Sequence, residues 1–211
     1  MNERALVGMA LLTFAIAGWA YTVLPEEIAT HWNVEGVADG FGEKLWGIIL
    51  FPLISAAMYG IYKIIPIIEP LKKNVESFHA AFAMFMFSMQ LFFVYVFALL
   101  IAYNLGNSFN FGKWMLLGMA FLVYQIGVLL PQTKRNHFIG FRTPWTLSDD
   151  AVWKETHEKT GNAFRVMSLL PIVGFVSEYP SLWWMAGAIV VPVVYGVVVS
   201  FLLFRKKKKT T

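Results

Sequence analysis

Residues 78–103, FHAAFAMFMFSMQLFFVYVFALLIAY, decide the fold of this chain, because the run contains no Asp, Glu, Lys or Arg. A hydrocarbon core about 30 Å thick is crossed by a helix of about 20 apolar residues, so this run is long enough. Lipid offers no partner to unpaired backbone groups, and the run is far too long for a barrel strand. We therefore predict a membrane-spanning helix.

Four further apolar runs have comparable length, at residues 5–24, 45–62, 114–130 and 182–204. A sixth, residues 164–176, is shorter and reaches span length if its helix continues upstream through residues 160–162 or if the bilayer thins. The composition agrees, since only 14% of residues are charged, against roughly 25% in soluble domains. The predicted fold class is an all-α polytopic membrane protein with six transmembrane helices, whose first partner is the lipid bilayer.

The distribution of cations predicts the orientation. With six spans and a cytoplasmic N-terminus, 15 of the 17 Lys and Arg residues lie inside, and only Lys44 and Lys113 lie outside. An excess of Lys and Arg in short loops marks the cytoplasmic side of a membrane. We therefore predict cytoplasmic N- and C-termini and a multi-pass protein of the cell (cytoplasmic) membrane.

The loops divide a single membrane domain, residues 1–211, into two predicted units. Residues 1–70 form an N-terminal two-span unit with an outer loop at 25–44. Residues 78–211 form a four-span unit with a cytoplasmic loop at 131–162.

The outer loop carries five acidic residues against one Lys. We expect an extended piece at residues 30–33, and turns at residues 33–36 and at Asp39 and Gly40, where glycine tolerates positive φ. One interpretation is a polar contact surface for a ligand, and the other is a self-packed cap that closes the helix bundle. The residues of this predicted surface are His31, Trp32, Asn33, Gly36, Asp39, Gly40 and Lys44.

The long cytoplasmic loop is basic in its first half and helical in its second. Thr143 precedes a proline and is expected to be extended. Thr146 or Ser148 is expected to cap a helix over residues 149–160. That helix places one set of side chains on a common side, namely Val152, Trp153, Thr156, His157 and Thr160.

This loop is interpreted either as a structural plug with satisfied polar groups or as a surface that binds a partner. Arg142, with its guanidinium fork, and Trp145, with one polar edge, are the strongest candidates for orienting a partner. The predicted functional block consists of Lys134, Asn136, Gly140, Arg142, Thr143, Pro144, Trp145, Trp153, Thr156 and His157.

The sequence does not predict an enzyme. It has no phosphate-binding glycine loop and no nucleophile elbow, and His157 lacks the second histidine of a zinc-protease helix because Gly161 stands there. We predict no catalytic residues, no metal site and no cofactor. Gln90 is expected to be the only strongly polar side chain in the middle of a span. Without a buried carboxylate, transport or export of a small amphipathic molecule is an alternative with weaker support.

Three blocks of the chain resemble the SdpI immunity family of membrane proteins. The first block lies in the outer loop, and its matching residues are Leu24, Pro25, His31–Asn33, Gly36, Ala38–Gly40 and Lys44. In the second loop they are Ile65, Pro66, Glu69, Pro70 and Lys72–Asn74, with Glu69 where Asp is commoner. In the third they are Leu130, Pro131, Lys134, Asn136, Phe138–Gly140, Arg142–Leu147, Val152, Trp153 and Thr156–Gly161, with Phe141 where Ile is commoner.

This resemblance implies a non-enzymatic immunity and signal-transduction protein. It would give resistance to a secreted antimicrobial peptide toxin outside the cell, as in bacteriocin immunity. It would also draw a cytosolic repressor to the membrane, without touching nucleic acid itself.

Overall fold

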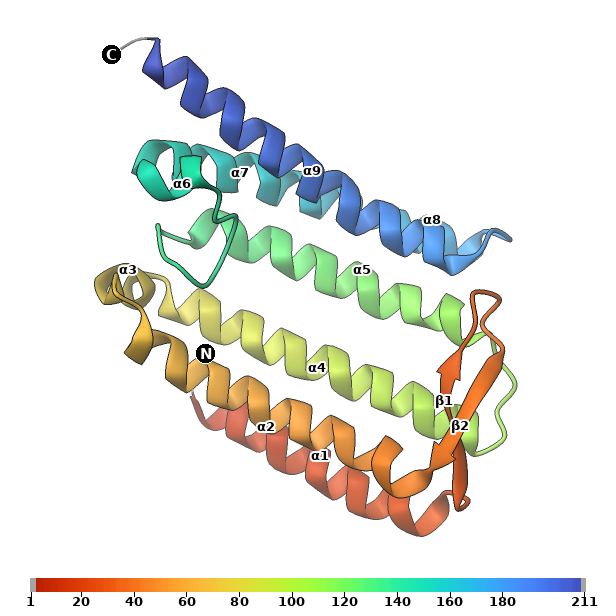
Figure 1. The fold of residues 1–211 in the computed structure, drawn as a ribbon. Helices are drawn as coiled ribbons and strands as arrows, with labels where there is room; N and C mark the ends of the chain where they lie inside the picture. The colour runs from red at the N-terminus through yellow and green to blue at the C-terminus, as the bar shows by residue number, and fades with distance from the viewer. Residues whose placement is uncertain (1–2, 210–211) are drawn as a thin grey trace.

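Five long apolar helices dominate the fold, which a computed structural model describes for residues 3–209 (Figure 1). They are α1 (Glu3–Val23), α2 (Lys44–Ile68), α4 (His79–Asn104), α5 (Phe111–Leu129) and α9 (Ser181–Lys208). Among the described residues, these five are long and apolar enough to cross a membrane. They coincide with the five long apolar runs, so the prediction of a multi-pass helical membrane protein is confirmed.

The shorter sixth run is not a helix of its own. Its first residues end α7 (Asp150–Met167), and the rest form α8 (Leu169–Val176) after a break at Ser168. Of the two possibilities left open by the sequence, the structure shows the upstream continuation, since α7 includes residues 160–162, and residues 149–160 do not form a separate segment. Together α7 and α8 lie along α5 and α9 (Figure 1).

The predicted caps of this helix are wrong. Asp149 is the N-cap of α7, and its carboxylate accepts hydrogen bonds from the N–H groups of Ala151 (2.8 Å) and Val152 (3.0 Å). Thr146 instead belongs to the short helix α6 (Pro144–Ser148), where it is paired with the N-cap Thr143. An Asp directly before a helix is as good a cap as Ser or Thr, and here it lies one position nearer to the helix.

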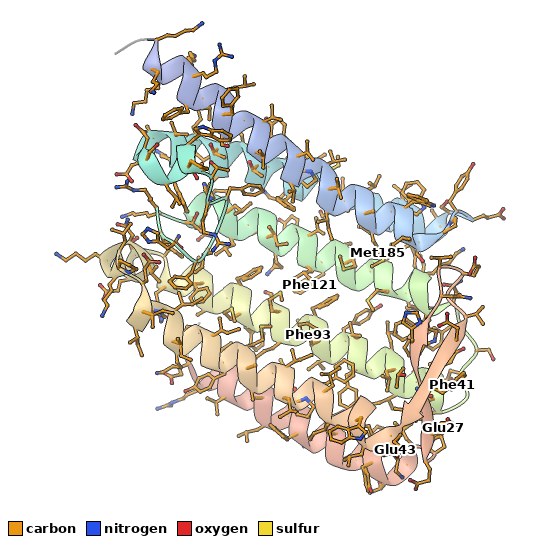
Figure 2. All side chains as sticks on the ribbon, viewed as in Figure 1. Glu27, Phe41, Glu43, Phe93, Phe121 and Met185 are labelled. Atoms are coloured by element: carbon orange, nitrogen blue, oxygen red, sulfur yellow. The ribbon has the colours of Figure 1, made fainter. Side chains whose placement is uncertain are left out.

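The bundle is organised around the central pair α4 and α5. Helices α1 and α2 pack against α4, while α7, α8 and α9 pack against α5. Apolar side chains pack between the central helices: Phe92 of α4 is buried in one cluster with Met119 and Val123 of α5, and Phe93, labelled in Figure 2, packs against it. In the first half, Gln90 is fully buried and its Nε2 donates to the carbonyls of Leu6 (3.2 Å) and Ser55 (3.0 Å). Gln90 therefore joins α1, α2 and α4.

A second amide lies within the apolar helices. Gln125 of α5 donates through its Nε2 to the hydroxyl of Ser88 in α4, at 2.5 Å. The expectation that Gln90 is the only strongly polar residue there is therefore wrong. Both amides serve as ties between helices.

A β-hairpin covers one end of the bundle and departs from the all-α prediction. Strand β1 (Glu27–Trp32) pairs antiparallel with β2 (Ala38–Glu43). The turn at residues 33–36 is confirmed, since Asn33 Oδ1 accepts from the N–H groups of Glu35 (3.1 Å) and Val37 (3.0 Å). Asp39 and Gly40 lie in β2 and not in a turn. Glycines within residues 38–43 hide the alternating pattern by which a strand is recognised.

The opposite end of the bundle is closed by short helices and the loop between them. Helix α3 (Lys72–Ser77) lies there, with the 3-10 helix η1 (Leu130–Gln132) and α6. The first turn of α1 and the last turn of α9 lie at this same end (Figure 1). Residues 1–2 and 210–211, which carry the predicted cytoplasmic termini, lie outside the described residues.

We expect Asn104→Ala to lower the free energy of unfolding by about 1–3 kcal/mol, because it leaves buried backbone groups unpaired. Asn104 Oδ1 accepts from the N–H of Ala29 (2.7 Å), and its Nδ2 donates to the carbonyl of Ala29 (3.1 Å). Thermal unfolding in detergent measures the loss. The control Asn107→Ala removes a bond to the exposed end of the same helix and should be nearly neutral. Equal losses for the two variants would contradict this role.

Candidate functional site

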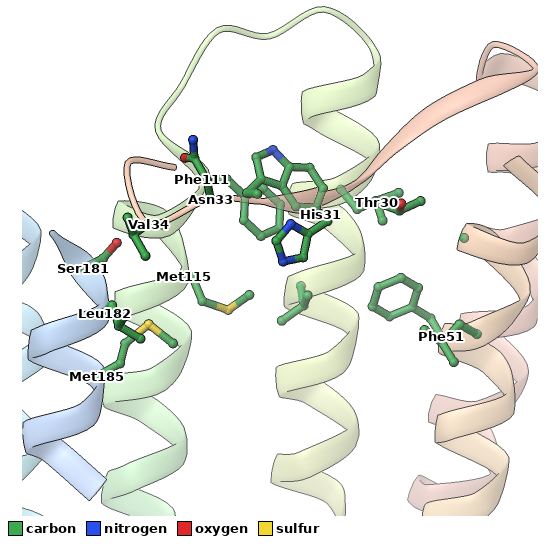
Figure 3. A pocket seen from close by; sticks show the side chains of 16 residues that line it. Thr30, His31, Asn33, Val34, Phe51, Phe111, Met115, Ser181, Leu182 and Met185 are labelled. Carbon is green, nitrogen blue, oxygen red and sulfur yellow. The ribbon is translucent and has the colours of Figure 1, made fainter. Parts of the chain in front are cut away.

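A cavity of about 420 Å³ lies beneath the hairpin, between the ends of α2, α4, α5 and α9 (Figure 3). This volume is within the range of about 300–1,000 Å³ that is usual for ligand pockets. The walls are apolar, with Leu50 and Phe51 on one side and Met115 and Met185 on the other. Only the roof and one edge supply polar side chains, from Thr30, His31, Asn33 and Ser181. The cavity, called the outer pocket below, therefore fits an amphipathic or apolar ligand.

The roof of the outer pocket is firmly held. Trp32 stacks on Phe111 at the start of α5, with ring centroids 3.7 Å apart and planes 9° apart, and Tyr103 contacts it edge-on. The turn of the hairpin is held by Asn110, whose Nδ2 donates to the carbonyl of Glu35 at 2.6 Å. These contacts join the hairpin to α4 and α5.

His31 is the roof residue with the clearest polar partner. Its Nδ1 lies 2.6 Å from Asp39 Oδ1, and the two side chains are 71% and 45% exposed. A carboxylate only accepts hydrogen bonds at neutral pH, so Nδ1 is the donor and Nε2 is left to face a ligand. Gly40 lies directly opposite His31, where a Cβ would come within 2.8 Å of the His31 Cβ.

The predicted outer-loop residues thus separate into three groups. His31, Trp32 and Asn33 line the outer pocket, whereas Gly36, Asp39 and Gly40 shape the hairpin behind them. Lys44 lies elsewhere: it is buried, and its Nζ contacts the Leu24 carbonyl (3.3 Å) and Glu26 Oε1 (3.0 Å). Lys44 therefore holds the junction of the hairpin with α1 and α2.

In the cytoplasmic block, Asn136 is the best-satisfied side chain. It is fully buried, and its Oδ1 accepts from the N–H groups of Phe138 (2.9 Å) and Ile139 (2.6 Å). Its Nδ2 donates to the carbonyls of Lys134 (2.8 Å) and Ile139 (2.9 Å). One carboxamide thereby folds the loop that precedes Gly140.

The loop is fastened to α7 by His157. The imidazole stacks on Trp153 with ring centroids 4.1 Å apart, its Nδ1 donates to the Trp153 carbonyl (2.7 Å), and its Nε2 accepts from the N–H of Phe141 (2.9 Å). Gly140 has a φ of 111°, and a Cβ there would lie 2.4 Å from Nε2. Only glycine fits this position without displacing the ring.

The remaining predicted residues of the block are divided between the interior and the surface. Thr143 and Pro144 begin α6 with a capping box, Trp145 rests on Phe201 with ring centroids 5.1 Å apart, and Thr156 is fully buried. Lys134 and Arg142 are exposed, and Arg142 Nη1 donates to the carbonyl of His137 at 2.9 Å. The block is mainly a buried plug, from which Lys134 and Arg142 reach the surface. Most of its buried polar groups are paired, but the Thr156 hydroxyl has no hydrogen-bond partner among the described residues.

Two residues of the inner end were not among the predicted site residues. Glu69 is fully buried, and its carboxylate accepts from the N–H of Leu71 (2.9 Å), the N–H of His137 (2.9 Å) and the His137 Nδ1 (2.8 Å). Burial alone would raise the pKa of Glu69, but the hydrogen bonds from His137 and the backbone outweigh it and hold the pKa below its usual value. The only signal in the sequence was the place of Glu69 in the second family block.

We expect Glu69→Gln to cost about 1–3 kcal/mol of stability, because an amide replaces one of two oxygens that accept three hydrogen bonds. Limited proteolysis of the loop at 133–143 and thermal unfolding in detergent would measure the loss. Glu76→Gln, in the exposed part of α3, is the matched control and should leave both unchanged. If Glu69→Gln behaved like wild type in both measurements, the carboxylate would not be needed to hold this loop in place.

Comparison with known proteins agrees with this geometry. Residues 132–203 match the SdpI/YfhL protein family, and residues 8–56 match a domain of unknown function (DUF1648). Immunity protein SdpI of Bacillus subtilis (strain 168) is 30% identical over 165 residues, which cover 78% of this chain and 74% of that protein. No solved structure matches the chain. With its helical membrane fold and the hairpin and plug built from the family's blocks, the chain belongs to the SdpI immunity protein family.

Proposed function

We propose that this protein protects a cell from a secreted antimicrobial peptide toxin by binding the apolar part of the toxin in the outer pocket. Homology to an immunity protein supports the immunity function. The observation that carries the mechanism is the pocket itself, an apolar cavity of about 420 Å³ roofed by His31, Trp32 and Asn33. A peptide held there is withdrawn from the bilayer that it would otherwise damage.

The proposed topology has six crossings, with α7 and α8 forming the fifth. The chain leaves α5 at the inner end through η1, yet Ser181 at the start of α9 lines the outer pocket. The segment between them therefore has to run from one end to the other. At about 1.5 Å per residue, the 18 residues of α7 and the 8 of α8 give roughly 40 Å, which exceeds the hydrocarbon core.

The proposed orientation puts the hairpin outside and the plug in the cytoplasm, in the cell (cytoplasmic) membrane. The cation distribution supports it, since the 15 predicted cytoplasmic Lys and Arg residues include the last-helix cluster Arg205–Lys209. The outer pocket then faces a secreted peptide. The function is binding and not catalysis.

A signalling role can be added to this proposal. Lys134 and Arg142 are the exposed cations of the plug, and they would dock a cytosolic repressor. Helix α2 offers the coupling, because it lines the outer pocket at Leu50 and Phe51 and ends at Glu69. Coupling of two sites requires two global states that each ligand distinguishes.

The transport alternative loses its main support. A water-filled cavity that reaches Gln90 would favour transport, but this amide is fully buried and its Nε2 joins α1, α2 and α4. Immunity by binding is therefore the proposed function.

Met185→Trp should abolish protection, because a larger side chain on the wall of the outer pocket excludes the ligand. Cells of a toxin-sensitive host that express each variant are challenged with the secreted peptide, and we expect at least about a tenfold loss in the tolerated concentration. Val190→Trp, on the exposed side of the same helix, is the matched control and should protect like wild type, at equal membrane levels by immunoblot. Full protection by Met185→Trp would contradict the proposal.

A further inference from the structure

Two residues that line the outer pocket also reach the outer surface of the bundle. Leu50 on α2 and Leu182 on α9 stand on the two sides of the pocket, and their side chains remain 52% and 49% exposed. Both lie in apolar helices whose outer faces contact lipid in a membrane. An apolar segment therefore has access to the cavity from the outer leaflet, directly below the polar roof.

The charge around the roof is mainly negative. The hairpin and its two ends carry Glu26, Glu27, Glu35, Asp39 and Glu43. Two cations lie at this end: Lys44, which is buried and paired with Glu26, and Lys113 in the first turn of α5. Glu27 stands opposite Glu43 in the strand register, an arrangement of like charges that destabilises a hairpin. The roof thus keeps a negative field that the fold itself does not need.

Asp39 brings this charge to the outer pocket. Its Oδ1 holds the His31 ring, which lines the cavity, and the Asp39 side chain is 45% exposed. Asp39 does not line the cavity itself but lies behind His31, with its side chain partly open to solvent. A cation next to an apolar segment would meet Asp39 at the same time as the segment enters between Leu50 and Leu182.

We propose that the outer pocket selects a peptide in which a Lys or Arg lies next to an apolar run. The apolar side chains fill the cavity, and the cation pairs with Asp39 beside His31. This inference rests on the proposed function, since it names the chemistry of the ligand of the same pocket. Charge complementarity favours such a peptide over an anionic phospholipid, which the acidic roof repels.

Two synthetic peptides test the proposal directly. Both consist of Leu and Ala, and they differ at one position beside the apolar run, where one has Lys and the other Gln. Each is titrated into the purified full-length protein in phosphatidylcholine nanodiscs, with protein-free nanodiscs as the blank for partition into lipid. Wild type should bind the Lys peptide about fivefold more tightly than the Gln peptide, as expected of a half-exposed ion pair.

Asp39→Asn and Glu27→Gln remove the same charge from the same hairpin, but Asp39 alone of the two contacts His31. Asp39→Asn should abolish the preference for Lys, while Glu27→Gln should keep it. Equal affinities of both peptides for wild type, or equal loss in the two variants, would overturn the proposal. Native mass spectrometry offers a further test. The proposal would also be overturned if wild type carried a bound phospholipid that Met185→Trp lacks, and if the Lys peptide did not displace this lipid from wild type.

The experiments can refute the immunity function and the selection of a cationic peptide independently of each other. If the Lys preference appears but Met185→Trp still protects cells, the pocket binds cationic peptides without serving immunity. If Met185→Trp loses protection but both peptides bind alike, the pocket serves immunity without selecting charge.

Discussion

The pair of hydrogen bonds between Asn104 and Ala29 is the contact on which the outer pocket depends. A two-stranded hairpin is marginal by itself in water, and here the carboxamide at the end of α4 satisfies both backbone groups of a buried strand residue. The stack of Trp32 on Phe111 adds a second attachment. The hairpin therefore serves as a fixed roof over the cavity below it.

The opposite end is closed by the same principle with different groups. There the loop between α5 and α6 is held by hydrogen bonds that involve the side chains of Glu69, His137 and His157. Polar side chains thus gather at the two ends. The helices between them are joined by apolar contacts, two amides and the Tyr95 hydroxyl, which donates to the Trp114 carbonyl. A bilayer imposes this division, because it offers no hydrogen-bonding partner in its centre.

The sequence predicted what depends on local pattern. Apolar runs located the long helices, and helical spacing placed Trp153 and His157 on the buried side of α7. The second strand was missed because Gly40 and Gly42 interrupt its alternation. The contact of Glu69 with His137 was missed because the residues are 68 positions apart. Their meeting depends on how α2 packs beside α4 and how α4 packs beside α5.

The account stands on the hairpin facing the outside of the cell and α3 facing the cytoplasm. The chain has no cysteine, so single-cysteine variants at two exposed positions, Glu43→Cys in the hairpin and Glu76→Cys in α3, give a clean measurement. A membrane-impermeant maleimide added to intact cells should label Glu43→Cys at once and Glu76→Cys only after the cells are opened. Labelling of both variants in intact cells, or of Glu76→Cys alone, would contradict the account.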